Sequence, residues 1–152
     1  MKKILFLFVF SLICLGSNAQ WRRQYVPGDE LTGIPSEWQY FYEEDNKIIS
    51  FTESSEMLII ATRKGIFDYN KDSQIIVLIG LYKDGQLISK GKYILNVTPD
   101  GKTAGNIGFK YMLDAIRRGA TIRIIAPLYK SFDFDLKTTK MYEGQRVIFN
   151  QQ

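Results

Sequence analysis

The sequence predicts a mainly β protein, an antiparallel β-sandwich or a partly closed barrel, with one short helix at about residues 109–118. Three observations predict it. Stretches rich in β-branched and aromatic residues recur along the chain, and turn residues such as Asp84-Gly85 separate them. One segment has apolar residues spaced as on one face of a helix. Sequential hairpins with a single helix are typical of a sandwich or a partly closed barrel.

The first 19 residues have the pattern of a secretory signal peptide. Lys2 and Lys3 give a positively charged start, and an almost unbroken apolar run covers residues 4–15. Ser17-Asn18-Ala19 follows, and its first and third residues have the small side chains that a signal peptidase requires. The run is too short for a membrane-spanning helix, which needs about 20 residues. We therefore expect cleavage after Ala19 and an exported protein, periplasmic or secreted, without a transmembrane segment.

Removal of residues 1–19 leaves 133 residues, the length of one domain. The formal charge falls from +4 to +2, because Lys2 and Lys3 are lost. A weak, dispersed charge gives no case for a nucleic-acid partner. An uncleaved membrane anchor, or a lipoprotein acylated at Cys14, is the alternative to cleavage after Ala19.

The residue types that are missing exclude several chemistries. Cys14 is the one cysteine of the chain, and the chain has no histidine. The mature protein therefore has no thiol and no imidazole, which excludes a Ser-His-Asp triad, a Cys-His pair and zinc sites built from Cys and His. We expect no cofactor and no metal. Carboxylate, Lys, Tyr, Ser or Thr chemistry and calcium bound by oxygen ligands remain possible.

The mature chain is expected to open with an irregular lead-in at residues 20–37, which hold two Pro and two Gly residues with little periodicity. The sandwich domain then covers residues 38–137. Residues 38–43 are rich in aromatic side chains and should pair with residues 47–52 as a hairpin. Residues 57–62 should form a further short strand.

The most clearly marked strand is Gln74–Tyr82, which is apolar at nearly every position and is therefore expected to be covered on both faces. The Asp84-Gly85 pair favours a tight hairpin turn, and the partner strand, residues 86–97, alternates between apolar and polar residues. The predicted helix at 109–118 ends at Gly119, a residue that suits a left-handed stop.

Two strands should follow the helix. Thr121–Ala126 is rich in β-branched residues, and Ser131–Lys137 alternates strictly between polar and apolar side chains. Residues 138–152 form an edge strand or a tail.

The elements expected in the second half of the chain follow a recognisable order: strand, Asp-Gly hairpin, strand, short helix, Gly, strand, and a last strand of alternating polar and apolar residues. Its residues are Ile75–Tyr82, Asp84-Gly85, Tyr111–Ile116, Gly119, Thr121–Ile125 and Phe132–Leu136. Over about residues 48–137 this pattern resembles exported bacterial β-sandwich proteins of the invasion-associated locus B type and of the VasI/TagO type associated with type VI secretion. The resemblance implies a non-enzymatic exported sandwich and assigns no binding residue.

Two sets of residues are candidates for a binding surface. Trp38, Tyr40 and Tyr42 share one face of a strand. That face is expected to be buried, but if exposed it would offer an aromatic platform to sugar rings or to a protein. Arg117 and Arg118, with Arg123 nearby, could grip a phosphate or a carboxylate. Favourable charges at the end of a helix explain the first two equally well.

The acidic residues give weaker signals. Asp133 and Asp135 share a strand face and could bind calcium, but a solvated face is the simpler interpretation. The acidic stretch Glu43-Glu44-Asp45, with Glu53 and Glu56 nearby, is expected to be a charged hairpin tip because it lacks the ligand spacing of a calcium loop.

The sequence therefore predicts an exported, non-catalytic binding module of the bacterial envelope or extracellular space, with an unidentified protein or glycan as partner. Its oligomeric state is left open. Two alternatives remain open. One is a glycan hydrolase that uses two carboxyl groups across a cleft. The other is a small-ligand binder that holds its ligand inside a barrel.

Overall fold

A computed structural model describes residues 20–33, 35–67, 73–127 and 134–141. The predicted signal peptide and residues 142–152 lie outside this part of the chain. Its strands form one nine-stranded antiparallel sheet in the order β1-β2-β3-β4-β7-β6-β5-β8-β9, which does not close into a barrel. The elements are β1 (Arg22–Val26), β2 (Glu37–Glu44), β3 (Lys47–Thr52), β4 (Leu58–Thr62), β5 (Gln74–Lys83), β6 (Gln86–Val97), β7 (Thr103–Asn106), α2 (Lys110–Arg117), β8 (Thr121–Ile125) and β9 (Asp135–Lys137).

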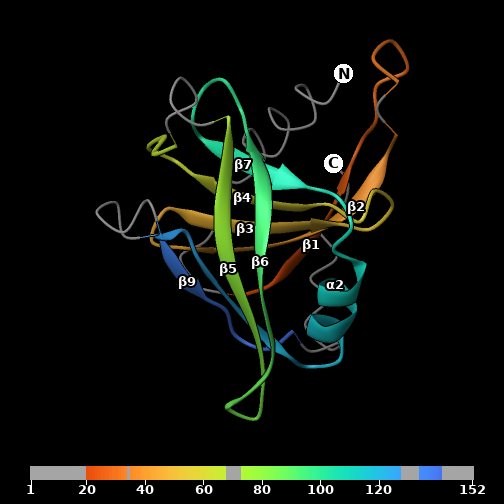
Figure 1. The fold of residues 1–152 in the computed structure, drawn as a ribbon. Helices are drawn as coiled ribbons and strands as arrows, with labels where there is room; N and C mark the ends of the chain where they lie inside the picture. The colour runs from red at the N-terminus through yellow and green to blue at the C-terminus, as the bar shows by residue number, and fades with distance from the viewer. Residues whose placement is uncertain (1–19, 34, 68–72, 128–133, 142–152) are drawn as a thin grey trace.

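The sheet folds over so that its two halves pack face to face. In Figure 1, β1–β4 run across the long β5–β6 hairpin, and α2 lies to one side of both. The short strand β7 joins the halves, because it pairs with β4 on one side and with β6 on the other. One core cluster contains buried side chains from both halves: Tyr42, Ile49, Phe51, Leu58, Ile60, Val77, Ile79, Leu81, Ile122 and Ile124. The predicted mainly β class, sandwich-like with one short helix, is thus confirmed.

The local turn and helix signals were accurate. The β5–β6 hairpin turns at Asp84 and Gly85, which both adopt positive φ, as a tight hairpin turn requires. The helix begins at Lys110 and ends at Arg117, one residue inside each predicted bound. Its buried face consists of Met112, Leu113, Ala115 and Ile116. No helix in the described part of the chain combines the length and apolar character that crossing a bilayer requires.

Two expectations about strands were wrong. Residues 20–37 are not an irregular lead-in throughout, because Arg22–Val26 forms β1 and pairs with β2. β5 is not covered on both faces. Its outward side chains include Ile76, which is 49% exposed. An apolar strand therefore faces the core on one side and is open on the other.

Strands β2, β3 and β4 also carry buried side chains on the face that points away from the main core. Phe41, Ile48, Met57, Ile59 and Ala61 form a separate buried cluster there. The predicted strand at residues 131–137 is described only from Phe134, where Asp135–Lys137 forms β9. From Thr138 to Met141 the chain forms no strand.

Candidate functional site

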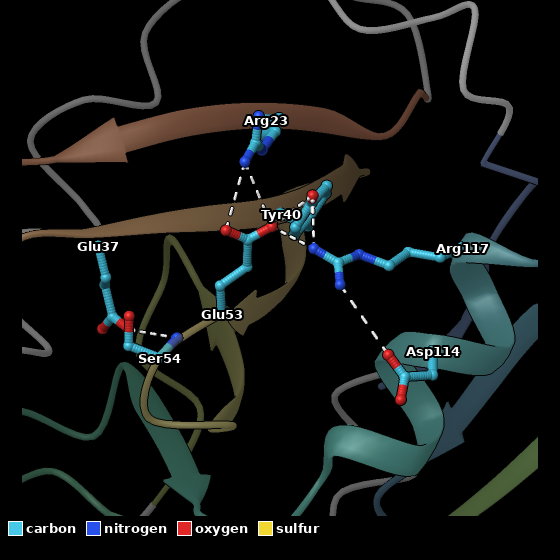
Figure 2. Close-up of polar contacts among 7 residues, drawn as sticks. All are labelled: Arg23, Glu37, Tyr40, Glu53, Ser54, Asp114 and Arg117. Carbon is cyan, nitrogen blue, oxygen red and sulfur yellow. Dashed lines mark hydrogen bonds and ion pairs between the residues drawn. The ribbon is translucent and has the colours of Figure 1, made fainter.

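An ionic and aromatic cluster lies on the inner face of the sheet at the end nearest α2. It consists of Arg23, Trp38, Tyr40, Glu53 and Arg117, and we call it the arginine–aromatic surface. Figure 2 shows Glu53 between the two arginines, with the Tyr40 hydroxyl directed at its carboxylate. Its members come from β1, β2, the turn after β3, and α2. The cluster therefore connects parts of the chain that are distant in sequence.

Strand register brings four of these residues together. In the β1–β2 pair Arg23 lies opposite Tyr40, and Tyr25 lies opposite Trp38. Directly opposed residues point to the same face of an antiparallel sheet. Glu53 directly follows β3, and its backbone N–H donates to the carbonyl of Trp38 at 2.9 Å. The fifth residue, Arg117, reaches the cluster from the last turn of α2.

Glu53 is the acceptor at the centre of the cluster. The Tyr40 hydroxyl donates to Oε1 of Glu53 at 2.7 Å, and Nη2 of Arg23 lies 3.3 Å from both carboxylate oxygens. Arg117 contacts the same Oε1 atom through Nη2 and donates to the Tyr40 hydroxyl at 2.8 Å. Its Nη1 atom lies 3.9 Å from the carboxylate of Asp114. One carboxylate thus orders two guanidinium groups and a phenol.

The charges of the cluster shift the pKa values of its members. Burial acts to raise the pKa of Glu53, but the hydrogen bond from Tyr40 and the charges of Arg23 and Arg117 outweigh it and lower the pKa. Burial acts to lower the pKa of Arg117, and its contacts with Tyr40 and Glu53 reverse this and raise it. Glu53 is therefore held as an anion, which does not suit a general acid.

The aromatic rings stack with the arginines. The guanidinium carbon of Arg23 lies 4.1 Å from the ring centroid of Trp38 and 5.6 Å from that of Tyr40, and Arg117 lies 4.8 Å from the Tyr40 ring. Tyr25 meets the Trp38 ring edge-on, with 5.4 Å between centroids. Tyr25 is exposed and Trp38 is half-buried, so Tyr25 adds a sixth residue to the arginine–aromatic surface, and these two rings form its accessible aromatic part.

The turn that carries Glu53 is held from a second side. The buried carboxylate of Glu37 accepts hydrogen bonds from the backbone N–H groups of Ser54 and Ser55, each at 3.2 Å, and Figure 2 shows the first of these. Inside the turn, Thr52 Oγ1 accepts the Met57 N–H at 3.0 Å. Glu53 thus sits on a fixed turn and not on a freely solvated hairpin tip.

The structure brings together three of the six residues that the sequence suggested for binding. Trp38, Tyr40 and Arg117 lie in the arginine–aromatic surface. Tyr42 belongs to the core, since it is 1% exposed and its ring packs on Trp21. Burial and the neighbouring Glu44 carboxylate raise the pKa of Tyr42 to about 12. Tyr42 therefore offers no accessible surface to a ligand.

The three arginines do not form one anion-binding group. Arg118 is exposed at the end of the helix, where its backbone N–H caps the last turn. Arg123 lies on the outer face of β8 and forms an ion pair with Asp135, with 2.8 Å between Nε and Oδ1. This contact lowers the pKa of Asp135. Asp135 is thus paired with Arg123, and Asp133, which the sequence placed on the same expected solvated face, lies outside the described residues.

Sequence reasoning missed Arg23, Tyr25 and Glu53. Arg23 and Tyr25 were missed because residues 20–37 were expected to be irregular, and Arg-Arg-Gln-Tyr-Val shows no alternation of polar and apolar residues that would mark a strand. Glu53 was noticed only as part of an acidic stretch. Comparison with known proteins adds nothing here, because no protein-family model, no curated protein and no solved structure matches the chain.

Proposed function

We propose that the chain is an exported, non-catalytic binding protein and that its arginine–aromatic surface contacts a protein partner in the envelope or outside the cell. Export rests on the signal-peptide pattern of residues 1–19. Binding rests on one observation: Tyr25 and Trp38 are accessible rings beside Arg23, which Glu53 holds in place. Tyr, Trp and Arg are the residue types most enriched at the energetic centres of protein interfaces.

The fixed geometry supports this proposal. A side chain that is already ordered loses less conformational entropy when a partner binds. Arg23 is held by Glu53 and by two rings, and Glu53 is held by Tyr40 and Arg117. The surface is therefore pre-organised for recognition.

The stacking of Arg23 favours a protein partner over a glycan. A sugar ring binds by lying flat against the face of an aromatic ring, and the guanidinium of Arg23 already covers one face of Trp38 at 4.1 Å. A protein can instead use the exposed edges of Tyr25 and Trp38 together with the arginines. A glycan ligand remains the main competing outcome of the experiment below.

The ionised state of Glu53 does not suit glycan hydrolysis at this surface. A glycan hydrolase needs one carboxyl group that stays protonated as a general acid, which requires a raised pKa. The pKa of Glu53 is lowered by its neighbours. Asp114 contacts the same arginine as Glu53, Arg117. This arrangement supports a binding role.

The test is capture of a partner with the mature protein, followed by direct measurement. Residues 20–152 would be immobilised and exposed to an envelope fraction. A protein that is enriched would then be purified, and its affinity for wild type, Tyr25→Ala and Trp38→Ala would be measured. We expect both variants to weaken binding at least about tenfold, as substitutions at interface centres do. Tyr111→Ala serves as the control, since Tyr111 is 60% exposed on α2.

Thermal unfolding of every variant checks that the fold is intact. Equal binding by wild type, Tyr25→Ala and Trp38→Ala would overturn the proposal. So would competition by free oligosaccharides, or loss of capture after glycosidase treatment of the fraction, because either result would identify a glycan ligand.

A further inference from the structure

The outer face of β5, β6 and β8 carries an apolar groove that no part of the arginine–aromatic surface reaches. Its volume is about 440 Å³, which lies within the range of about 300–1,000 Å³ found for small-molecule sites. Leu78 of β5 lies opposite Ile125 of β8, and both line the groove. Beyond them Ile76 and Ile94 lie opposite each other and are 49% and 52% exposed. The apolar surface is thus continuous along the strands.

A glycine creates the hollow. Gly80 lies two residues after Leu78 on the same face of β5, where a side chain would otherwise stand. A Cβ atom at Gly80 would lie 3.1 Å from the Tyr82 ring and 3.2 Å from Cδ1 of Leu87. The missing side chain therefore lets Tyr82 and Leu87 fold across the strand, where both line the groove.

Cationic side chains flank the apolar floor. Lys92 lies opposite Leu78, and Lys90 lies opposite Gly80, whose other neighbour is Arg123. Arg123 is paired with Asp135. Lys90 and Lys92 have no carboxylate partner among the described residues. The groove therefore combines an apolar floor with two lysines on its β6 side that no described carboxylate pairs with.

A third lysine adds positive charge near one end of the groove. The ammonium group of Lys137 lies 5.3 Å from the ring centroid of Tyr82, at the end of the groove that Tyr82 and Leu87 close. An exposed apolar patch with a charged rim marks a binding site, and here the sign of the rim selects an anion.

We propose that this groove binds a single-chain anionic amphiphile: an acyl chain lies on Leu78 and Ile125, and its acidic head group pairs with Lys90 and Lys92. This site is separate from the arginine–aromatic surface and does not depend on the function proposed for it.

The position of the groove in the sheet favours this occupant. β5 lies between β6 and β8, so its backbone groups are already paired on both sides. A bound peptide would find no backbone partners there, and its own N–H and C=O groups would lose water without compensation. An acyl chain has no such groups. A second copy of this chain would bring the same cationic side chains and no carboxylate from among the residues that line the groove.

The probes are three soluble amphiphiles used below their micelle concentrations: dodecanoate, octanoate and dodecyltrimethylammonium. Binding to residues 20–152 would be measured by calorimetry and by backbone amide chemical shifts. We expect saturable one-to-one binding of dodecanoate, with shifts confined to β5, β6 and β8. Octanoate should bind at least about tenfold more weakly, because four fewer methylenes are buried. The cationic chain should be weaker by a similar factor.

Charge reversal provides the decisive comparison. The Lys90→Glu/Lys92→Glu protein should lose about tenfold in dodecanoate affinity, as expected when two ion pairs become two repulsions. The Lys64→Glu/Lys102→Glu protein carries the same change in net charge at two exposed lysines outside the groove, and it should bind like wild type. Leu78→Asn should abolish the difference in affinity between dodecanoate and octanoate.

Several results would overturn the inference: equal affinity for the anionic and cationic chains, shifts outside the three strands, or an equal loss in the two charge-reversed proteins. Binding to anionic phospholipid vesicles without binding of monomeric dodecanoate would also overturn it, since that pattern indicates a membrane surface. The variants Tyr25→Ala and Trp38→Ala should bind dodecanoate with the affinity of wild type, so each of the two proposals can be refuted without the other.

Discussion

The indole N–H of Trp21 donates a hydrogen bond to the backbone carbonyl of Thr139, with 2.9 Å between nitrogen and oxygen. Trp21 directly precedes β1, and Thr139 lies just after β9, so the bond joins the two edges of a sheet that does not close. The Trp21 ring also packs on Tyr42 and Phe51, with centroids 5.6 and 6.2 Å apart. One side chain therefore links both edges to the core.

We predict that Trp21→Phe lowers the free energy of unfolding by about 1 kcal/mol, because it removes the hydrogen bond and keeps most of the packing. Trp21→Ala should cost about 3–5 kcal/mol, since the ring is 3% exposed. Urea unfolding followed by circular dichroism measures both. A loss for Trp21→Phe as large as that for Trp21→Ala would contradict this prediction, because the ring packing that Phe keeps would then contribute nothing.

We predict that Glu53→Gln destabilises the protein in a pH-dependent way. The folded-state pKa of Glu53 lies below its ordinary value of 4.5, so the ionised carboxylate stabilises the fold above that value. This contribution is lost as the pH falls through the lowered folded-state pKa. The difference in unfolding free energy between wild type and Glu53→Gln should therefore be about 1–3 kcal/mol near neutral pH and shrink on acidification.

Urea unfolding from about pH 7 to about pH 3 measures this trend. Tyr40→Phe provides the matched control, because it removes one hydrogen bond to Glu53 and keeps the ring. Its stability should depend on pH less than that of wild type and more than that of Glu53→Gln. Parallel pH profiles for wild type and Glu53→Gln would contradict the assignment of Glu53 as the central anion.

The helix and the hairpins were predictable because their signals are local. Asp84-Gly85 determines a turn by its own backbone preferences, and the apolar stripe of α2 lies within one short segment. The face shared by Trp38, Tyr40 and Tyr42 also follows from strand geometry alone. What the alternation could not reveal is which part of that face stays accessible, because this depends on α2 and β1.

The remaining parts of the site depend on contacts between distant segments. β1 is a strand because it pairs with β2, and Glu53 finds Arg117 64 residues further along the chain. The groove lies on a face of β5 that no described element packs against. The apolar run of β5 was interpreted as buried on both sides, but apolar composition cannot say whether another layer lies above Ile76 and Leu78.

We predict that the effects of Arg117→Ala and Arg123→Ala on stability are additive within about 0.5 kcal/mol, because the two arginines share no partner. Arg117 contacts Glu53, Tyr40 and Asp114, whereas Arg123 contacts Asp135. By contrast, Arg117→Ala and Glu53→Ala should show a coupling of about 0.5–3 kcal/mol. Double-mutant cycles by urea unfolding measure both quantities. Coupling between Arg117 and Arg123 would restore the idea of one arginine cluster.

We predict that Gly101→Ala is far more damaging than Gly85→Ala, although both glycines have positive φ, +67° and +79°. Nothing lies within 4 Å of a Cβ atom added at Gly85, so Gly85→Ala should cost about 1–2 kcal/mol, the penalty of the left-handed conformation. A Cβ atom at Gly101 would overlap the backbone carbonyl of Phe67, whose N–H donates to the Gly101 carbonyl at 2.9 Å.

Because that obstacle is backbone, Gly101→Ala must displace the Phe67 segment, and we expect it to cost at least about 2 kcal/mol more than Gly85→Ala. The Phe67 ring is 3% exposed and lies 6.0 Å from the Phe134 ring, so the displacement would reach the core. Thermal and urea unfolding of the two variants compare the costs. Equal losses would mean that positive φ alone, and not the close approach to Phe67, explains glycine at position 101.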